Sequence, residues 1–319
     1  MYHGIINVYK PAGFTSFDVV AKLRGILKQK KIGHTGTLDP MATGVLPVCL
    51  GNGTKLCDML TDRSKEYICQ MLLGVASDTE DVTGKIENIQ STNLEKADIE
   101  AAVRAFIGDY DQIPPMYSAL KVNGKKLYEL AREGKVIERK PRRVCIHGID
   151  IMEISQIKSS EVLSDETLEG YQLVLVKMKV ACSKGTYIRS LCRDIGTSLG
   201  TYGCMLSLVR SRVGAFNLDN ALTMEDIETL RDEDRLERAV LSLEMALDQY
   251  ESLHIHPEYK KKIDNGNPLP LEAFVEEPDR IDGIKYKVYN AEGIFNAVYC
   301  FDEDKQLFMP DKFFPVDQE

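Results

Sequence analysis

The sequence has no apolar run long enough to cross a membrane, so no membrane-spanning helix is expected. Its first residues do not form a basic region followed by an apolar core, which predicts no secretory signal. The eight cysteines are scattered, with no Cys-x-x-Cys pair and no zinc-like spacing. This pattern favours a cytoplasmic protein with reduced, buried thiols. His254 and His256 lack further ligands nearby, so we expect ordinary side chains there and no metal site.

The sequence also lacks a net positive charge. Its formal charge is −9, which argues against an RNA partner because RNA affinity depends largely on neutralising phosphates. However, three segments are strongly basic. Seven Lys/Arg and two acids lie in residues 1–55, nine and three in residues 121–147, and six and one in residues 179–212. Residues 217–251 hold eleven acids and three bases. A positive surface on an acidic body suits a polyanion, although charge runs also form ordinary solvated surfaces.

No internal repeat, low-complexity tract or phosphate-binding loop is present. Residues 51–55, GNGTK, lack the Gly-x-x-x-x-Gly-Lys-Ser/Thr spacing that cradles phosphates, which disfavours a nucleotide hydrolase. The most informative stretch is 33–44, GHTGTLDPMATG, where Asp39 is the sole carboxylate. Pro40 disfavours helical backbone at Asp39, and the glycines allow tight turns and close approach of a ligand. The stretch is therefore either an accessible acid on a fixed loop or a surface turn, and residue types alone favour the turn.

Periodicity and turn residues predict a mixture of strands and helices. Strands are expected at 4–10, 66–74, 142–154 and 171–182, and helices at 93–107, 127–132 and 187–199. Another helix is expected to begin at a Ser16 cap, with an apolar face formed by Val19, Val20, Leu23, Ile26 and Leu27. Residues 109–124 are expected to be loop, 155–170 a flexible hairpin insertion, and 223–247 two acidic helices.

Five stretches resemble motifs of one enzyme family. Residues 31–47, KIGHTGTLDPMATGVLP, resemble the catalytic motif of bacterial tRNA pseudouridine-55 synthases of the TruB type. The other four are 9–16 (YKPAGFTS), 114–121 (PPMYSALK), 183–191 (SKGTYIRSL) and 208–214 (LVRSRVG). Their agreement in family order over residues 9–214 argues against chance.

The resemblance implies an α+β (mixed α/β) fold with two domains. A catalytic domain over 1–250 would have a central, mainly antiparallel sheet flanked by helices. A composition change near residue 250 agrees with a small β-rich domain over 251–319. In the family this position is occupied by a PUA-like domain, so the resemblance implies one here. From residue 252 onward the chain holds fourteen acids and eight bases, which argues against strong RNA binding there.

The resemblance also implies the reaction. The chain would isomerise uridine to pseudouridine at position 55 of the tRNA T-loop, with no cofactor, metal, membrane or obligate protein partner. The C1′–N1 bond breaks, the uracil rotates, and C5 joins C1′. One acid acting as nucleophile or as base on the sugar suffices, and the resemblance assigns this to Asp39. The partner would be the T-arm and elbow of tRNA, with the target base everted.

Further residues match family positions. Arg189 would be the cation that keeps Asp39 ionised, and Tyr67 would stack on the uracil. Their alternatives are a solvent-facing helix arginine and a half-buried strand tyrosine. The matching substrate-binding positions are His34, Lys10, Tyr187, Leu208 and Asp81, although Leu208 fits a plain core position nearly as well.

Two other functions remain open. A non-catalytic RNA chaperone could use the same fold to open and refold the tRNA elbow, but it would not need Asp39. A guide-RNA-dependent relative of the family is the closest enzymatic alternative. The sequence has no long basic tail of the kind such relatives often have, which favours a stand-alone enzyme.

Overall fold

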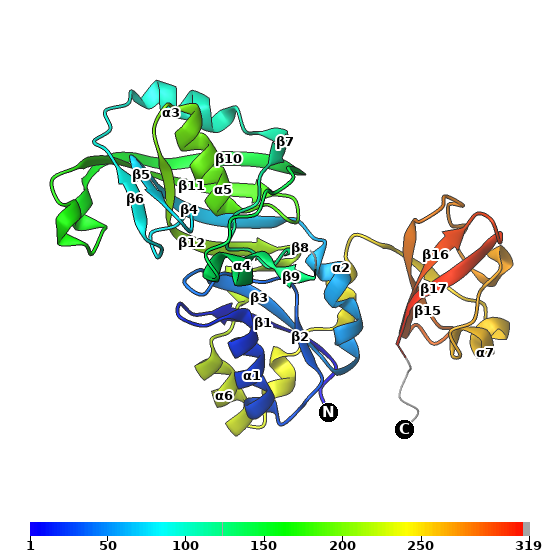
Figure 1. Cartoon of the computed structure of the whole chain (residues 1–319). Helices are drawn as coiled ribbons and strands as arrows, with labels where there is room; N and C mark the ends of the chain where they lie inside the picture. Colours follow the sequence, from blue (N-terminus) through cyan, green and yellow to red (C-terminus); the bar gives the residue numbers. More distant parts are fainter. Residues whose placement is uncertain (123, 315–319) are drawn as a thin grey trace.

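The computed structural model describes residues 1–122 and 124–314, and a large twisted sheet forms the body of the molecule (Figure 1). The strands follow the order β1-β3-β12-β4-β11-β10-β7, with β2 pairing β3 and β13 pairing β12. Their bounds are β1 (Gly4–Lys10), β2 (Ile32–His34), β3 (Thr43–Leu50), β4 (Lys65–Leu73), β7 (Gly108–Gln112), β10 (Arg142–Lys158), β11 (Gln172–Cys182), β12 (Gly203–Val213) and β13 (Phe216–Asn217). Only the β3–β12 pair is parallel among these, so the predicted mainly antiparallel sheet is confirmed.

Helices cover two separate regions of this sheet. The α-helices of the described residues are α1 (Ser16–Leu27), α2 (Cys57–Thr61), α3 (Lys96–Arg104), α4 (Leu127–Arg132), α5 (Ile188–Ser198), α6 (Met224–Asp232) and α7 (Lys260–Ile263), and α7 lies beyond this sheet, in the C-terminal part of the chain. Side chains of α3 and α5 pack with β4, β10 and β11 in one apolar cluster, whereas α1 and α6 pack with β1 and β3 in another. Figure 1 shows these two groups of helices at opposite ends of the sheet. The predicted mixed α+β class is confirmed.

Helix α1 has the predicted apolar face but a different cap. Its five predicted apolar residues are all buried. The cap is Thr15, not Ser16: the Thr15 hydroxyl accepts a hydrogen bond from the Asp18 amide at 3.1 Å, and the Asp18 carboxylate accepts one from the Thr15 amide at 2.8 Å. This reciprocal capping box satisfies two donors that a lone Ser16 would leave open. Ser16 instead turns inward and accepts a hydrogen bond from the Leu38 amide at 2.9 Å.

Several other local predictions were wrong. Strand β10 runs to Lys158 because residues 153–158 pair with β11, so the 155–170 hairpin insertion is shorter than expected. Strand β7 occupies the start of the predicted 109–124 loop. The predicted 93–107 helix is limited to α3, and of the two acidic helices only α6 is an α-helix, followed by 3₁₀ turns. For β7 and the end of β10, pairing with a neighbouring strand overrides local propensity.

Smaller hairpins connect these elements. One consists of β5 (Val75–Ser77) and β6 (Ile86–Ile89), and the other of β8 (Lys121–Val122) and β9 (Lys125–Lys126). Within the residues that the structure describes, no helix is long and apolar enough to span a membrane.

The C-terminal part forms a second, smaller sheet. It contains β14 (Glu251–His254), β15 (Lys285–Tyr289), β16 (Phe295–Asp302) and β17 (Leu307–Phe313) in that order. A C-terminal β-rich unit is therefore confirmed, whereas the exact boundary at residue 250 stays a prediction and 315–319 lie outside the described residues. Val298 and Phe314 share an apolar cluster with Leu56 and Met59, so the small sheet packs against the region of α2 (Figure 1).

Candidate active site

The predicted site centres on residues 33–44, the Asp39 loop, which joins β2 to β3. Gly36 and Gly44 both have φ of +103°, a backbone region that favours glycine. A Cβ on Gly44 would lie 2.3 Å from the Arg210 carbonyl oxygen, so only glycine lets β3 approach β12 there. The loop therefore leaves and re-enters the sheet at two glycines, with Asp39 between them.

Lys10 holds this loop to the N-terminal motif. Its side chain is fully buried, and burial lowers the pKa of the ammonium to about 8. The ammonium donates hydrogen bonds to the carbonyls of Pro11, Phe14 and Pro40 at 2.9, 2.6 and 2.9 Å. Lys10 was predicted to contact substrate. In this structure its ammonium instead joins the 9–16 motif, through Pro11 and Phe14, to Pro40, the residue after Asp39.

Asp39 and Arg189 form a two-point contact. Arg189 Nε lies 2.9 Å from Asp39 Oδ2, and Nη2 donates to Oδ1 at 3.1 Å. The guanidinium also donates to the carbonyls of Thr79 and Tyr117, each at 2.9 Å, and its Nε lies 3.8 Å from Asp81 Oδ2. The Arg189 side chain is only 5% exposed, so the alternative of a solvent-facing helix arginine was wrong.

The environment of Asp39 is asymmetric. Its carboxylate is bound by the guanidinium, yet its side chain remains 39% exposed. Charge-assisted hydrogen bonds of this fork type fix both the position and the rotation of a carboxylate. The arrangement therefore presents an oriented, accessible carboxylate, which can act chemically as a nucleophile or as a base.

Tyr67 lies on β4 within the same apolar cluster as Leu208 and Leu38. It is 8% exposed, and burial raises the pKa of its phenol to about 12, although the Arg210 guanidinium opposes the shift. The hydroxyl is thus neutral near pH 7. Tyr67 and Leu208 lie on adjacent strands, β4 and β12, and both belong to the apolar cluster that includes the residue preceding Asp39.

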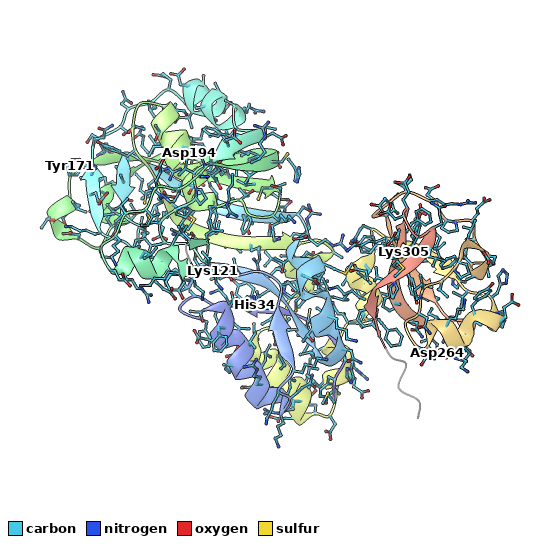
Figure 2. The ribbon with its side chains drawn as sticks, turned by 45° about the vertical axis from the view of Figure 1, so that its right-hand side comes forward. His34, Lys121, Tyr171, Asp194, Asp264 and Lys305 are labelled. Carbon is cyan, nitrogen blue, oxygen red and sulfur yellow. The ribbon has the colours of Figure 1, made fainter. Side chains whose placement is uncertain are left out.

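His34 and Tyr187 border the site from different elements. His34 ends β2 near the middle of the molecule (Figure 2). Burial and the Arg210 charge lower its pKa, and among the described residues its buried Nδ1 has no hydrogen-bond partner. Tyr187 caps α5, and its backbone amide donates to the Gln112 side chain at 2.8 Å. His34 therefore contributes a half-buried ring at this edge of the site, with its Nδ1 turned inward.

Asp81 lies in the turn between β5 and β6. Its Oδ1 accepts hydrogen bonds from the Thr79 hydroxyl and the Thr83 amide, both at 2.9 Å, while Oδ2 faces Arg189. The carboxylate is thus turned toward the guanidinium and held there by its own turn. Asp81 contacts the partner of Asp39, not an open surface.

Sequence reasoning missed a second contact between this turn and α5. Glu80 has φ of +64°, which is unusual for a residue with a side chain. Its carboxylate accepts a hydrogen bond from the Ser190 hydroxyl at 2.6 Å and forms an ion pair with Arg193. Arg193 also donates to the Ile113 carbonyl at 3.1 Å. Only the four-residue spacing between Arg189 and Arg193 hinted that both reach one neighbouring turn.

The predicted basic surface includes the β8–β9 hairpin and α4. Lys125 lies 3.4 Å from Glu133, whereas Lys126 and Arg132 lie over the Tyr128 ring, 5.4 and 5.5 Å from its centroid. Cation–π contacts of this kind order the cations without neutralising their charge. This short segment therefore presents fixed positive groups.

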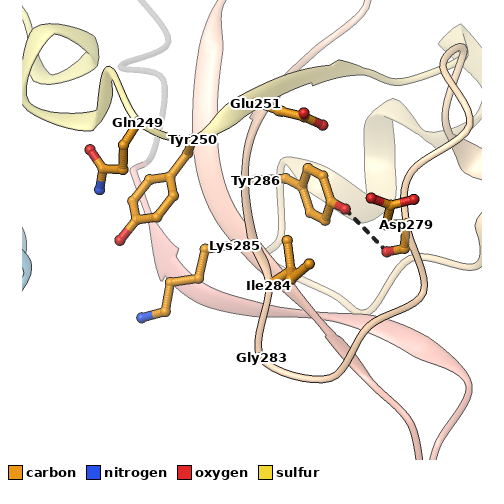
Figure 3. Close-up of a pocket in the computed structure, with 8 residues that line it drawn as sticks. All are labelled: Gln249, Tyr250, Glu251, Asp279, Gly283, Ile284, Lys285 and Tyr286. Carbon is orange, nitrogen blue, oxygen red and sulfur yellow. Dashed lines mark hydrogen bonds between the residues drawn. The ribbon is translucent and has the colours of Figure 1, made fainter.

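A separate hollow lies in the C-terminal unit. Tyr250, Lys285 and Tyr286 line it, and the Tyr286 hydroxyl donates to the Asp279 carbonyl at 3.1 Å (Figure 3). Its lining includes none of the residues predicted for the site. Lys285 is also bound to Asp311 at 2.6 Å, so its charge is already compensated.

Comparisons with known proteins identify the family. Residues 24–188 match the model described as "TruB family pseudouridylate synthase (N terminal domain)", and residues 189–248 match "tRNA pseudouridylate synthase B C-terminal domain". The tRNA pseudouridine synthase B of Lachnoclostridium phytofermentans is 50% identical over 314 residues, covering 98% of this chain and 99% of that protein. The one from Clostridium novyi is 46% identical over 293 residues, covering 92% and 93%.

A solved structure agrees with the fold. The Cbf5 fold in the archaeal box H/ACA sRNP Nop10–Cbf5 complex matches with a TM-score of 0.71 at 23% identity, covering 99% of this chain and 87% of that chain. This likeness supports the architecture alone. From the family models and the two full-length relatives, the chain belongs to the TruB family of pseudouridylate synthases.

Proposed function

We propose that the chain isomerises uridine to pseudouridine in tRNA, at position 55 of the T-loop, with Asp39 as the reacting carboxylate. The observation that supports this best is the Asp39–Arg189 contact, in which a buried guanidinium orients a carboxylate that stays 39% exposed. Relatives that match 98% and 92% of the chain bear the name tRNA pseudouridine synthase B. Family and geometry thus point to the same side chain.

The reaction asks little of the protein beyond one oriented carboxylate. The C1′–N1 bond breaks, the uracil turns, and C5 bonds to C1′; C5 then loses its proton while N1 gains one. Asp39 can assist by attacking the nucleotide or by removing a sugar proton, and both routes need the ionised form. Arg189 supports either route because it fixes the carboxylate beside the bound nucleotide, and a misplacement of 1 Å costs about 100-fold in rate.

Tyr67 and Leu208 would hold the target base. Unpaired RNA bases are commonly stacked on aromatic rings, and burial raises the pKa of the Tyr67 phenol to about 12, which extends the pH range over which this ring is uncharged. Everting the base costs a few kcal/mol of stacking and pairing, which contacts along the T-arm must offset. His34 and Tyr187 would contact the nucleotides beside the target, whereas Asp81 and Lys10 would act by holding Arg189 and the Asp39 loop.

The basic segments would bind the T-arm and elbow. Residues 121–147 hold nine Lys/Arg against three acids, and in this segment Lys126 and Arg132 are fixed over Tyr128. Phosphate contacts of this type supply affinity without reading sequence. A pure RNA chaperone would use the same surface but has no use for an oriented Asp39 carboxylate, so catalysis is the better interpretation.

Mass-spectrometric mapping of an unmodified tRNA transcript tests the proposal. Purified protein alone should convert uridine 55, whereas Asp39→Asn should form no pseudouridine and bind tRNA as well as the parent protein. Asp232→Asn is the matched control, because Asp232 is 66% exposed and pairs with its neighbour Arg231. Turnover by purified Asp39→Asn would refute the catalytic assignment, and conversion at another uridine would refute the T-loop assignment.

A further inference from the structure

Arg210 lies at the centre of the large sheet, between the two strands that carry the proposed site. On β12 its register partners are Gly44 of β3, on the parallel side, and Tyr67 of β4, on the antiparallel side. It is one of the largest fully buried side chains, at 1% exposure. A guanidinium is thus buried beside both the Asp39 loop and the tyrosine proposed to stack on uracil.

The Arg210 guanidinium bridges the two ends of the Asp39 loop. Nε donates to the Val45 carbonyl at 2.8 Å, and Nη2 donates to the Gly36 carbonyl at 3.3 Å. Gly36 precedes Asp39 by three positions, whereas Val45 follows where the loop has rejoined β3. One rigid fork therefore fixes the separation of the points where the chain leaves and re-enters the sheet.

The third neighbour of Arg210 is the Tyr67 hydroxyl. Tyr67 is the residue of β4 that pairs with Arg210 in the sheet, and the Arg210 charge lowers the pKa of the Tyr67 hydroxyl, against the larger effect of burial. Among the described residues no carboxylate forms an ion pair with Arg210, and burial lowers its pKa, with Tyr67 alone opposing this. A buried cation without an anion is costly, and deviations of this kind occur chiefly at functional sites.

We propose that Arg210 is a positioning residue for pseudouridine formation, which holds the two ends of the Asp39 loop and the Tyr67 hydroxyl in one fixed arrangement. Asp39 and the Tyr67 ring must act on the same uridine, yet Asp39 lies in the loop before β3 and Tyr67 lies on β4. Arg210 lies on β12, between β3 and β4; it donates to the carbonyls of Gly36 and Val45 and pairs with Tyr67 across the sheet. The catalytic effect of Arg210 rests on the proposed function. The contact of Arg210 with Gly36 and Val45 does not depend on that function.

Arg210→Met tests the inference against a matched control. Lys65→Met also removes a buried cation from the same sheet: Lys65 is 8% exposed and donates to the carbonyls of Thr61 and Arg63 at 2.6 and 2.7 Å, outside the loop. Arg210→Met should lower the single-turnover rate about 100-fold, as expected for a misplaced reacting group, with tRNA affinity nearly unchanged. Lys65→Met should keep the parent rate per folded molecule.

Two further measurements separate positioning from general stability. Amide hydrogen exchange of residues 36–45 should be faster in Arg210→Met than in Lys65→Met, with or without RNA. In a double-mutant cycle, Arg210→Met should cost less in a Tyr67→Phe background than in the parent protein, because the polar group that faces the guanidinium from β4 is already absent. The proposal would be overturned if the rate losses of Arg210→Met and Tyr67→Phe simply multiply in the double variant and the hydrogen exchange of residues 36–45 is the same in Arg210→Met as in Lys65→Met.

Arg210→Lys keeps the inference testable if the Met variant does not fold. Lysine retains the charge but has a single nitrogen, so it cannot reproduce the separate Nε and Nη2 contacts of the planar guanidinium, and the folded Lys variant should still lose at least about tenfold in rate. A parent-like rate would overturn the inference while leaving the proposed function intact. Conversely, if the parent protein forms no pseudouridine but Arg210→Met still loosens residues 36–45, the proposed function fails and the loop contact stands.

Discussion

Arg189 reaches Asp39 with two nitrogens, Nε at 2.9 Å from Oδ2 and Nη2 at 3.1 Å from Oδ1, across 150 positions of sequence. Asp39 is supplied by the loop between β2 and β3, and Arg189 by the first turn of α5. The remaining guanidinium contacts, to the Thr79 and Tyr117 carbonyls, fix it from two further segments. Four segments of the chain therefore meet at this ion pair, and three of them fix the orientation of the Asp39 carboxylate.

Arg189→Met should lower the single-turnover rate by about 100-fold while tRNA affinity changes little, because the carboxylate loses its orienting partner. The variant should also lose about 1–3 kcal/mol of stability, since the partly buried carbonyls of Thr79 and Tyr117 lose their donor. Rate on tRNA across several pH values and thermal melting measure the two effects. Arg231→Met, an exposed helix arginine paired with Asp232, is the control. A parent-like rate at every pH would contradict the assignment.

Tyr67→Leu should slow catalysis strongly with little loss of tRNA affinity, because one stacked base is a small part of a phosphate-dominated contact. The control is Tyr286→Leu, a tyrosine on β15 that is 1% exposed and belongs to the C-terminal core. It should lose stability but not rate per folded molecule. The folded fraction and the single-turnover rate are measured together. Activity of Tyr67→Leu that merely follows the folded fraction would show a core role.

Replacing Lys125, Lys126 and Arg132 together by glutamine should weaken tRNA binding and flatten its salt dependence. Each lost phosphate contact lowers the slope of log affinity against log salt by about 0.9 on a duplex. The control is the triple glutamine variant of Lys260, Lys261 and Lys262 in α7, within the acidic C-terminal unit. Its slope should stay that of the parent protein. An unchanged slope in the first variant would mean that the basic surface lies elsewhere.

Deleting the chain from residue 251 should lower the melting temperature yet leave activity on an isolated T-arm stem-loop. All five family motifs precede this point. However, the deletion removes Val298 and Phe314 from the apolar cluster that includes Leu56 and Met59, so apolar surface becomes exposed. Melting and turnover per folded molecule are measured on the same preparation. A folded but inactive truncation would mean that the C-terminal unit contributes directly to catalysis.

The sequence by itself determined the features that depend on neighbouring residues. Glycines at 36 and 44 allow the turns of the loop around Asp39, and the spacing of apolar residues specifies the buried face of α1. These follow because backbone dihedral preferences and side-chain periodicity act within a few residues. Even so, the α1 cap moved from Ser16 to Thr15, since the reciprocal contact with Asp18 forms only with Thr15 at the cap.

Only the tertiary structure decided which distant residues meet. Strand β3 contains Gly44 and Pro47 and gave no strand prediction, yet it pairs with β1, β2 and β12. That pairing buries Arg210 between the Asp39 loop and Tyr67, and the placement of α5 brings Arg189 to Asp39. Such contacts depend on strand order and register, which are set by burial over the whole sheet, so a single residue pattern does not specify them.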